Sequence, residues 1–182
     1  MQYVGGNRLT LLRNGEQYFP ALLAAIDAAK SEVCLESYIY ADDQTGSLVT
    51  DTLARAAARG ARLRLLLDGF GARDFPARWR HSLRAAGAEV LVFRPEVASL
   101  RPRRGRLRRM HRKLACIDGQ VAFCGGINLI DDFRDPTYGS LEQPRFDLAV
   151  RVGGPLVADV HETMTRLWLR IQVTREAKRF DF

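Results

Sequence analysis

Apolar runs of strand length alternate with amphipathic runs of helix length through the first half of this 182-residue chain. The predicted order is strand 8–12, helix 14–30, strand 33–40, helix 47–59, strand 63–67, helix 77–86 and strand 90–93. The strands are almost continuously apolar, which is typical of a parallel sheet buried on both faces. The pattern predicts an α/β fold in which helices cover both faces of a largely parallel sheet.

The second half of the chain predicts antiparallel pairing. Residues 110–124 form two β-prone runs around Asp118 and Gly119, a dipeptide favoured in two-residue type I′ turns because both central positions need positive φ. With these two residues as the loop, the hairpin register places His111 across from Gly126.

A further strand is predicted over 146–152 and a closing amphipathic helix over 156–171. Hydrophobic residues make up 47% of the chain, enough for one core at this length. We therefore expect residues 1–182 to form a single domain.

Positive charge is concentrated in one short segment. The chain has a net charge of +7, whereas residues 101–113 alone carry seven arginines, one lysine and no acid, so the remainder sums to 7 − 8 = −1. Such a patch indicates a polyanionic partner, either nucleic acid or an anionic membrane surface. Apolar residues mixed into the loop favour the membrane. The predicted anion-binding and membrane-binding residues are Arg101, Arg103, Arg104, Arg106, Arg108 and Arg109.

The cysteines and the N-terminus bear on the cellular compartment. Cys34, Cys116 and Cys124 lie in apolar runs without CxxC spacing, which predicts three reduced, buried thiols. No signal-peptide pattern and no apolar run of about 20 residues is present. We expect a cytoplasmic protein that lies peripherally at the inner face of the cell membrane.

One group of polar residues is suited to catalysis. Residues two apart in a strand face the same way, so His111 and Lys113 project together. Gly125 and Gly126 are expected to leave open backbone opposite them, and Asn128 follows at the end of the second arm. An imidazole, an ammonium, a carboxamide and open backbone are the groups that phosphoryl transfer needs.

The spacing of these residues resembles the HKD signature, H-x-K-x4-D-x6-G-[GS]-x-N, of the phospholipase D superfamily. The matching residues are His111, Lys113, Asp118, Gly125, Gly126 and Asn128. Stretches such as CLESYIYADDQTG and RGARLRLLLDGFG extend the resemblance from about Asn7 to Leu169. The sequence is most similar to bacterial cardiolipin synthases of the type that lacks N-terminal transmembrane helices.

The resemblance implies a fold and a mechanism. The fold is a phospholipase D-type α/β/α sandwich with a mixed, mostly parallel sheet and a β-hairpin that carries the motif. His111 attacks the phosphorus of a phosphodiester to form a phosphohistidine. Lys113 and Asn128 hold the phosphate oxygens, together with Gly125 and Gly126 as phosphate-binding residues.

The resemblance also implies roles for two carboxylates. Asp118 joins the catalytic motif as a structural and electrostatic member without a proton-transfer step, and Asp147 orients the catalytic histidine. An acceptor on one ring nitrogen fixes the tautomer that leaves the other nitrogen free to attack. Neither a metal nor a cofactor is required.

The chain departs from the family pattern because it holds one HKD motif, whereas the family joins two in one active site. The second histidine protonates the leaving alcohol, which a nucleophile alone cannot do. The partner half comes either from the same, longer chain or from a second copy across a two-fold axis.

The predicted function is transfer of a phosphatidyl group from phosphatidylglycerol, or a related phospholipid, to an alcohol. Two alternatives stay open. One is a homodimeric phosphodiesterase of the phospholipase D type that acts on nucleic acid. The other is a half-domain that binds anionic membrane and is inactive alone.

Overall fold

The computed structural model describes residues 3–95 and 109–180, with side chains up to residue 174. The elements that precede the basic segment are β1 (Arg8–Arg13), α1 (Asn14–Asp27), β2 (Glu32–Ser37), α2 (Gln44–Ala58), β3 (Arg62–Asp68), α3 (Ala77–Ala85) and β4 (Glu89–Phe93). Those that follow it are β5 (Leu114–Ile117), β6 (Val121–Gly125), β7 (Arg134–Asp135), β8 (Gly139–Ser140), β9 (Leu148–Gly153) and α4 (Leu156–Phe180). No helix among the described residues is both long and apolar enough to cross a membrane.

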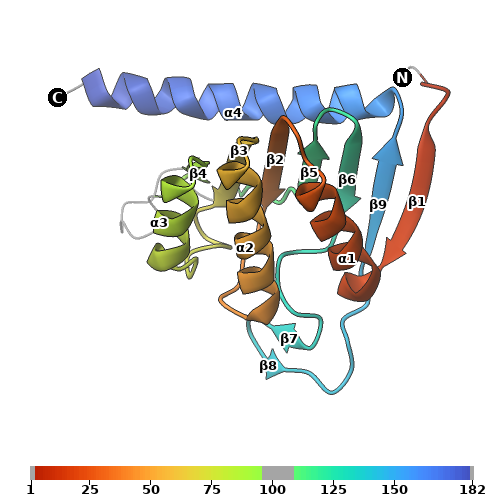
Figure 1. Ribbon diagram of the computed structural model, residues 1–182. Coiled ribbons are helices and arrows are strands. Elements are labelled where there is room, and N and C mark those ends of the chain that lie inside the picture. Colours follow the sequence, from red (N-terminus) through yellow and green to blue (C-terminus); the bar gives the residue numbers. More distant parts are fainter. Residues whose placement is uncertain (1–2, 96–108, 181–182) are drawn as a thin grey trace.

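Seven strands form one mixed sheet in the order β1-β9-β6-β5-β2-β3-β4 (Figure 1). Only the β2–β3 and β3–β4 pairs are parallel, and the other four pairs are antiparallel. The expectation of a mostly parallel sheet is therefore wrong. Helical crossovers connect only β2, β3 and β4, because β1 joins the far edge beside β9 and the β5–β6 hairpin inserts next to β2.

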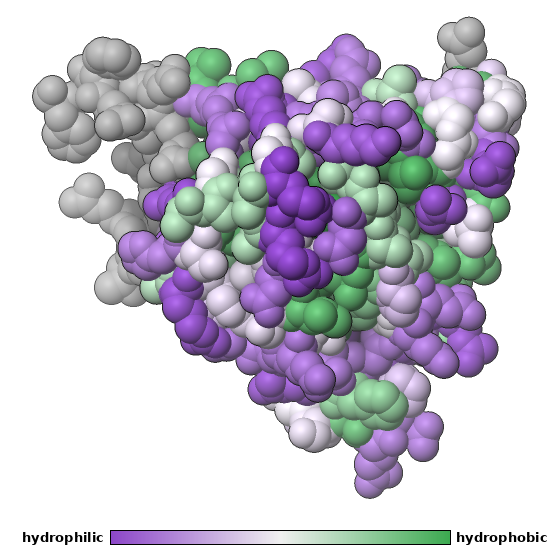
Figure 2. Space-filling view, viewed as in Figure 1, coloured by the Kyte–Doolittle hydropathy of each residue, from purple (hydrophilic) through white to green (hydrophobic). Residues whose placement is uncertain are grey.

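Helices cover both faces of the sheet, which confirms the α/β/α sandwich. α1, α2 and α3 pack on one face and α4 on the other (Figure 1). Gly60 and Gly87 follow α2 and α3 with φ of 97° and 94°, the left-handed conformation in which glycine commonly ends a helix. Figure 2 shows that the face with the three helices is coated mainly by hydrophilic residues, as amphipathic helices require.

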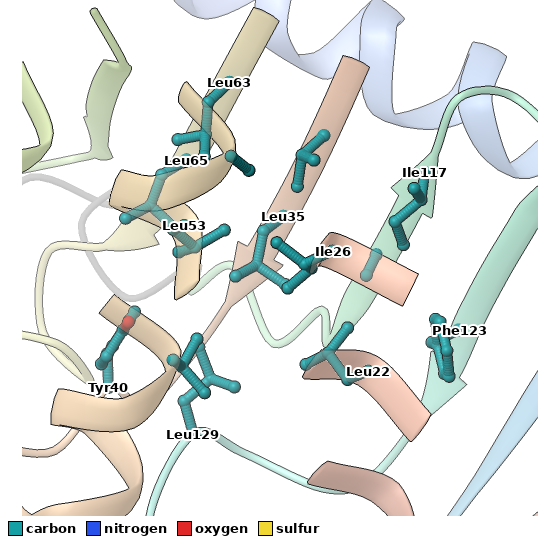
Figure 3. Packing of buried hydrophobic residues seen from close by; sticks show 14 of the residues in the cluster. Leu22, Ile26, Leu35, Tyr40, Leu53, Leu63, Leu65, Ile117, Phe123 and Leu129 are labelled. Atoms are coloured by element: carbon teal, nitrogen blue, oxygen red, sulfur yellow. The ribbon is translucent and has the colours of Figure 1, made fainter. Parts of the chain in front are cut away.

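The main core lies between the sheet and the helices α1 and α2 (Figure 3). Leu22 and Ile26 of α1 and Leu53 of α2 are fully buried against Leu35 of β2 and Leu65 of β3. Each such side chain stabilises the fold by roughly 1.5–3 kcal/mol through burial. Both faces of β2 and β3 are covered, which explains their continuous apolar runs.

A smaller core joins α4 to the opposite face of the sheet. Val157 and Met164 pack there against Cys34, Cys116 and Ala122. Burial of these two thiols confirms the prediction for them.

Cys124 is exposed, so the prediction that all three thiols are buried is wrong. It lies on the same face of β6 as Ala122, two residues further along. The apolar cover provided by α4 ends at Ala122 and leaves the Cys124 thiol accessible.

Candidate active site

His111 and Lys113 lie at the end of the sheet where β2 and β3 finish. The Lys113 ammonium nitrogen is 3.2 Å from both ring nitrogens of His111 and 3.2 Å from its carbonyl oxygen. Lys113 is buried with 7% of its surface exposed, whereas His111 is open to solvent. The predicted juxtaposition of the two side chains is confirmed.

Tyr38 forms a wall of this site. Its ring centroid is 4.7 Å from that of His111, and the Lys113 nitrogen is 5.2 Å from the Tyr38 centroid. The ring face attracts the ammonium through a cation–π interaction. Tyr38 follows directly after β2. Its position at the carboxyl end of a parallel strand is the sequence signal that could have placed it at the site.

Asn128 is held in a fixed orientation beside the same segment. Its Oδ1 accepts a hydrogen bond of 3.1 Å from the N–H of Ile39, the residue after Tyr38. Ile39 also accepts from the Leu129 N–H at 3.2 Å. Because its side-chain oxygen already accepts this hydrogen bond, the amide nitrogen of Asn128 is left to donate to a ligand.

Asp147 lies just before β9 and is clamped to the start of α1. Its N–H donates to Asn14 Oδ1 at 3.0 Å, and the Asn14 N–H donates to its carbonyl oxygen at 2.9 Å. The backbone of Asn14 has a φ of 52°, a conformation that asparagine tolerates. Asn14 is a positioning residue that the sequence analysis missed.

The Asp147 carboxylate influences Lys113 directly. Burial lowers the pKa of the Lys113 ammonium, and the charge of Asp147 raises it. No hydrogen bond joins Asp147 to His111 within the described residues, and its Oδ1 accepts instead from the Leu148 N–H at 2.8 Å. The orienting role toward His111 stays a prediction.

The hairpin register differs from the predicted one. Asp118 and Gly119 have positive φ, 52° and 63°, as a type I′ turn requires. However, Gln120 stays in the loop as a third residue instead of pairing. Each opposing pair along the two arms is therefore shifted by one residue, and the alignment of His111 with Gly126 is wrong.

The two glycines provide space rather than phosphate donors. The Gly125 N–H donates to the Lys113 carbonyl at 3.3 Å, and the Gly126 N–H donates to the Leu148 carbonyl at 2.9 Å. Since both N–H donors are used inside the sheet, they are not free to bind a phosphate oxygen, and the phosphate-binding role of the two glycines stays a prediction. A Cβ atom at Gly126 would collide with the Asp147 carboxylate, so glycine is needed there for Asp147 to approach.

Asp118 is remote from His111 and Lys113. Its carboxylate accepts hydrogen bonds of 2.8–2.9 Å from the backbone N–H groups of Lys30, Ser31 and Glu32. Although partial burial opposes the effect, these bonds lower its pKa to about 2. Strand β5 separates Asp118 from His111, so the geometry agrees with the structural role expected for Asp118, and its membership of the catalytic set stays a prediction.

Asp68 positions the segment that carries the histidine. This buried carboxylate ends β3 and accepts a hydrogen bond of 2.7 Å from the Met110 N–H, one residue before His111. It also accepts from the N–H groups of Phe70 and Gly71. The sequence analysis missed Asp68, although its place at the end of an apolar strand was a usable signal.

Most of the basic segment is outside the described part of the chain. The predicted membrane-binding residues outside the described ranges are Arg101, Arg103, Arg104, Arg106 and Arg108. Arg109 is described, and its guanidinium carbon lies 4.7 Å from the ring centroid of Phe70. The last residue before Met110 therefore stacks on the loop that follows β3.

A second polar cluster lies on the α4 face. His161 Nε2 is 2.6 Å from Glu32 Oε2, a partner that the sequence did not indicate. Ligand atoms of Glu32, Cys34 and His161 lie within 4.8 Å of one another. However, Arg64 lies 3.5 Å from Glu32 and already supplies a cation, so we interpret the cluster as an ion-pair network.

Similarity to known proteins agrees with this geometry. Residues 22–138 match the protein family described as "Cardiolipin synthase, PLD-like domain". The chain is 38% identical over 155 residues to cardiolipin synthase B of Shigella flexneri, which covers 85% of this chain and 37% of that protein. The chain belongs to the PLD-like domain family of cardiolipin synthases. This PLD-like domain thus spans little more than a third of the length of the curated relatives it matches.

Solved structures share the fold at low sequence identity. NucT from Helicobacter pylori superposes with a TM-score of 0.63 at 15% identity and covers 94% of this chain and 97% of that chain. Nuc from Salmonella typhimurium, a phospholipase D family member, has a TM-score of 0.62 at 15% identity, with coverage of 92% and 95%. In the PLD-like domain, His111, Lys113 and Asn128 fall inside the matched residues 22–138, and Asp147 falls outside them.

Proposed function

We propose that this PLD-like domain supplies the nucleophilic half of a phosphatidyltransferase site. The observation that carries the proposal is the Lys113 ammonium 3.2 Å from both ring nitrogens of an exposed His111. A nucleophile beside a fixed cation and an oriented amide donor suits attack on a phosphodiester, whose charge develops on the equatorial oxygens.

The reaction proceeds in two displacements. A His111 ring nitrogen attacks phosphorus, the nitrogen–phosphorus bond forms, and the bond from phosphorus to the leaving alcohol oxygen breaks. That oxygen takes a proton from an acid. An acceptor alcohol then gives up its proton to the same group and attacks phosphorus, which releases His111 and completes the transfer.

Lys113 and Asn128 bind the phosphate oxygens through both steps. Lys113 is held against the Tyr38 ring, and the nearby Asp147 charge counteracts the loss of its proton on burial. Asn128 donates from its amide nitrogen because Ile39 occupies its oxygen. Such preorganised donors lower the barrier without reorganising during the reaction.

The proton donor is the histidine of a second HKD motif, which the sequence of this chain does not contain. Because the matched relatives are more than twice as long, we assign this second half to further residues of the same polypeptide. The substrate is then a phospholipid such as phosphatidylglycerol, taken from an anionic membrane to which the protein attaches peripherally.

A homodimeric phosphodiesterase acting on nucleic acid is the second candidate. It is favoured by one observation: the chains of Nuc and NucT are almost fully covered by this single-motif domain, 95% and 97% respectively. In this candidate, a second copy of the domain supplies the second motif across a two-fold axis. Native mass spectrometry separates the two assemblies, because one is a long monomer and the other a dimer of short chains.

Substrate choice decides between the two functions. The protein in its native assembly is incubated with phosphatidylglycerol labelled in the phosphate, and separately with single-stranded and double-stranded DNA. We expect labelled lipid products and a labelled peptide containing His111 after alkaline work-up. DNA cleavage without any lipid product would overturn the phosphatidyltransferase and support the phosphodiesterase.

A further inference from the structure

A polar cleft lies at the corner of the sheet formed by β1 and β9, which we term the corner cleft. It has a volume of about 250 Å³ and is lined by Gly6, Arg8, Thr10, Gln120, Val121, Arg151, Gly153 and Gly154. In Figure 1 no helix lies in front of the upper ends of β9 and β1, the two strands that supply most of its lining.

The strand register brings the polar side chains of the corner cleft together. Thr10 pairs with Arg151, and Arg8 pairs with Gly153 on the same two strands. Residues two apart share a face, so Arg8 and Thr10 of β1 lie on the face that also carries Arg151 of β9. Gly153 adds room, because a Cβ atom there would meet nothing within 4 Å.

The charge of the corner cleft is positive and uncompensated. None of the residues that line it is acidic. In the described part of the chain, neither Arg8 nor Arg151 takes part in an ion pair. Other described arginines on or beside this sheet, such as Arg64 and Arg112, do have carboxylate partners. Two guanidinium groups that share a cleft repel each other until an anion binds between them.

The corner cleft is separate from the catalytic pair. Along β9, Arg151 is four residues beyond Asp147, which corresponds to roughly 13 Å of extended chain. Lys113, His111 and Asn128 do not line it. An anion in the corner cleft would therefore be a second ligand and not the reacting phosphodiester.

We propose that the corner cleft binds a phosphate group through Arg8 and Arg151. Guanidinium groups bind phosphate oxygens in bidentate fashion, and the Thr10 hydroxyl and the Gln120 amide supply neutral hydrogen bonds. The phosphate belongs either to a phospholipid headgroup or to a free phosphate such as glycerol phosphate. The proposal does not depend on the proposed reaction, because occupancy is measured without turnover.

The first experiment measures binding of free phosphates to the purified protein. Inorganic phosphate and glycerol 1-phosphate are titrated, and the backbone amide resonances of Gly153 and Gly154 report on the corner cleft, whereas those of Gly125 and Gly126 report on the catalytic site. In the double variant Arg8→Gln, Arg151→Gln, we expect the affinity read at Gly153 to fall about tenfold or more.

The matched control is Arg13→Gln, which removes the same charge from β1 but on the opposite face of the sheet. It should leave the affinity unchanged. The two single variants repeat the test if the double variant is unfolded by circular dichroism. Equal loss in Arg13→Gln, or no phosphate response at Gly153 and Gly154 in the wild-type protein, would overturn the proposal.

The second experiment identifies the source of the phosphate. Vesicles of phosphatidylcholine with and without phosphatidylglycerol are sedimented with the wild-type protein, the double variant and Arg13→Gln. A headgroup ligand predicts that only the double variant loses affinity for the phosphatidylglycerol vesicles. A free phosphate ligand predicts equal sedimentation of all three proteins, with the response at Gly153 retained for glycerol 1-phosphate. Absence of both responses would exclude the site.

Discussion

At the scale of single residues, the site combines one exposed and one buried basic group. His111 is open to solvent and available to a substrate, whereas Lys113 is fixed under it by burial and by the Tyr38 ring. The two side chains consequently have different sensitivities to substitution. Loss of the exposed His111 side chain should leave the packing intact, whereas loss of the buried Lys113 side chain leaves a void.

Replacement of the nucleophile tests the residue-level assignment. We expect His111→Asn to lower kcat by about three orders of magnitude or more, because no other group forms the phosphorus–nitrogen bond. The free energy of unfolding should change by less than about 0.5 kcal/mol, since the side chain is exposed. His81→Asn, which alters an exposed histidine of α3, is the control. Wild-type turnover in His111→Asn would contradict the assignment.

Glu36 gives a prediction for the pH dependence of stability. It is 3% exposed under α4, and burial raises its pKa to about 7 despite Arg112 at 3.3 Å. A raised folded-state pKa favours the protonated form. The stabilisation is therefore complete below the ordinary pKa of about 4.5 and is lost as the pH rises to about 7.

The expected size of this loss is up to about 3 kcal/mol between pH 4.5 and 8. Urea unfolding of the wild-type protein and of Glu36→Gln over this range measures it. In Glu36→Gln the free energy of unfolding should vary less with pH and should exceed the wild-type value at pH 8. A parallel pH dependence in both proteins would mean that Glu36 does not titrate as stated.

At the scale of elements, two carboxylates at strand ends hold the segments that form the site. Asp68, at the end of β3, fixes Met110 and hence the entry to His111. Asp118, at the turn between β5 and β6, fastens the hairpin to the loop between α1 and β2. Both act through backbone N–H groups, so each converts a loop into a rigid support.

The structural role of Asp118 predicts a loss of stability without a loss of chemistry. Asp118→Asn keeps a residue that tolerates the positive φ but removes the charge and one acceptor oxygen. We expect the free energy of unfolding to fall by about 1–3 kcal/mol, measured by urea denaturation at pH 7. Asp51→Asn, on the exposed side of α2, is the matched control. A lowered kcat with unchanged stability would instead place Asp118 in the reaction.

At the scale of the whole molecule, we expect the positive charge of residues 101–113 to govern attachment to anionic membranes. Each arginine near an anionic surface contributes about 1 kcal/mol. Replacing four arginines by alanine should therefore weaken vesicle binding by up to about 4 kcal/mol, and less at high salt because exposed charges are screened. The four are Arg101, Arg103, Arg104 and Arg106.

Sedimentation with phosphatidylglycerol vesicles at low and high salt measures this effect. Turnover of a monomeric short-chain phospholipid should persist in the same variant, because these arginines precede His111 by five or more residues. A control variant loses four arginines from exposed positions elsewhere: Arg55, Arg59, Arg73 and Arg166. Loss of short-chain turnover would mean that the basic segment reaches into the site.

The sequence by itself determined most elements and the pairing of His111 with Lys113. Local periodicity and terminal glycines are properties of neighbouring residues, so the helices, the central strands and the ends at Gly60 and Gly87 could be predicted. The projection of His111 and Lys113 to one side also follows from the two-residue repeat of an extended chain. The spacing of the HKD motif indicated the protein family.

Only the tertiary structure decided which strands are neighbours and what surrounds the pair. Three of the four antiparallel pairs, β1–β9, β6–β9 and β2–β5, join strands distant in sequence, and no local pattern encodes them. For the same reason, the Asn14–Asp147 clamp was not predictable, and the strand-end positions of Asp68 and Tyr38 could indicate the site but not their contacts with Met110 and His111. These contacts join segments distant in sequence, and their formation depends on the free energy of the packed sheet as a whole.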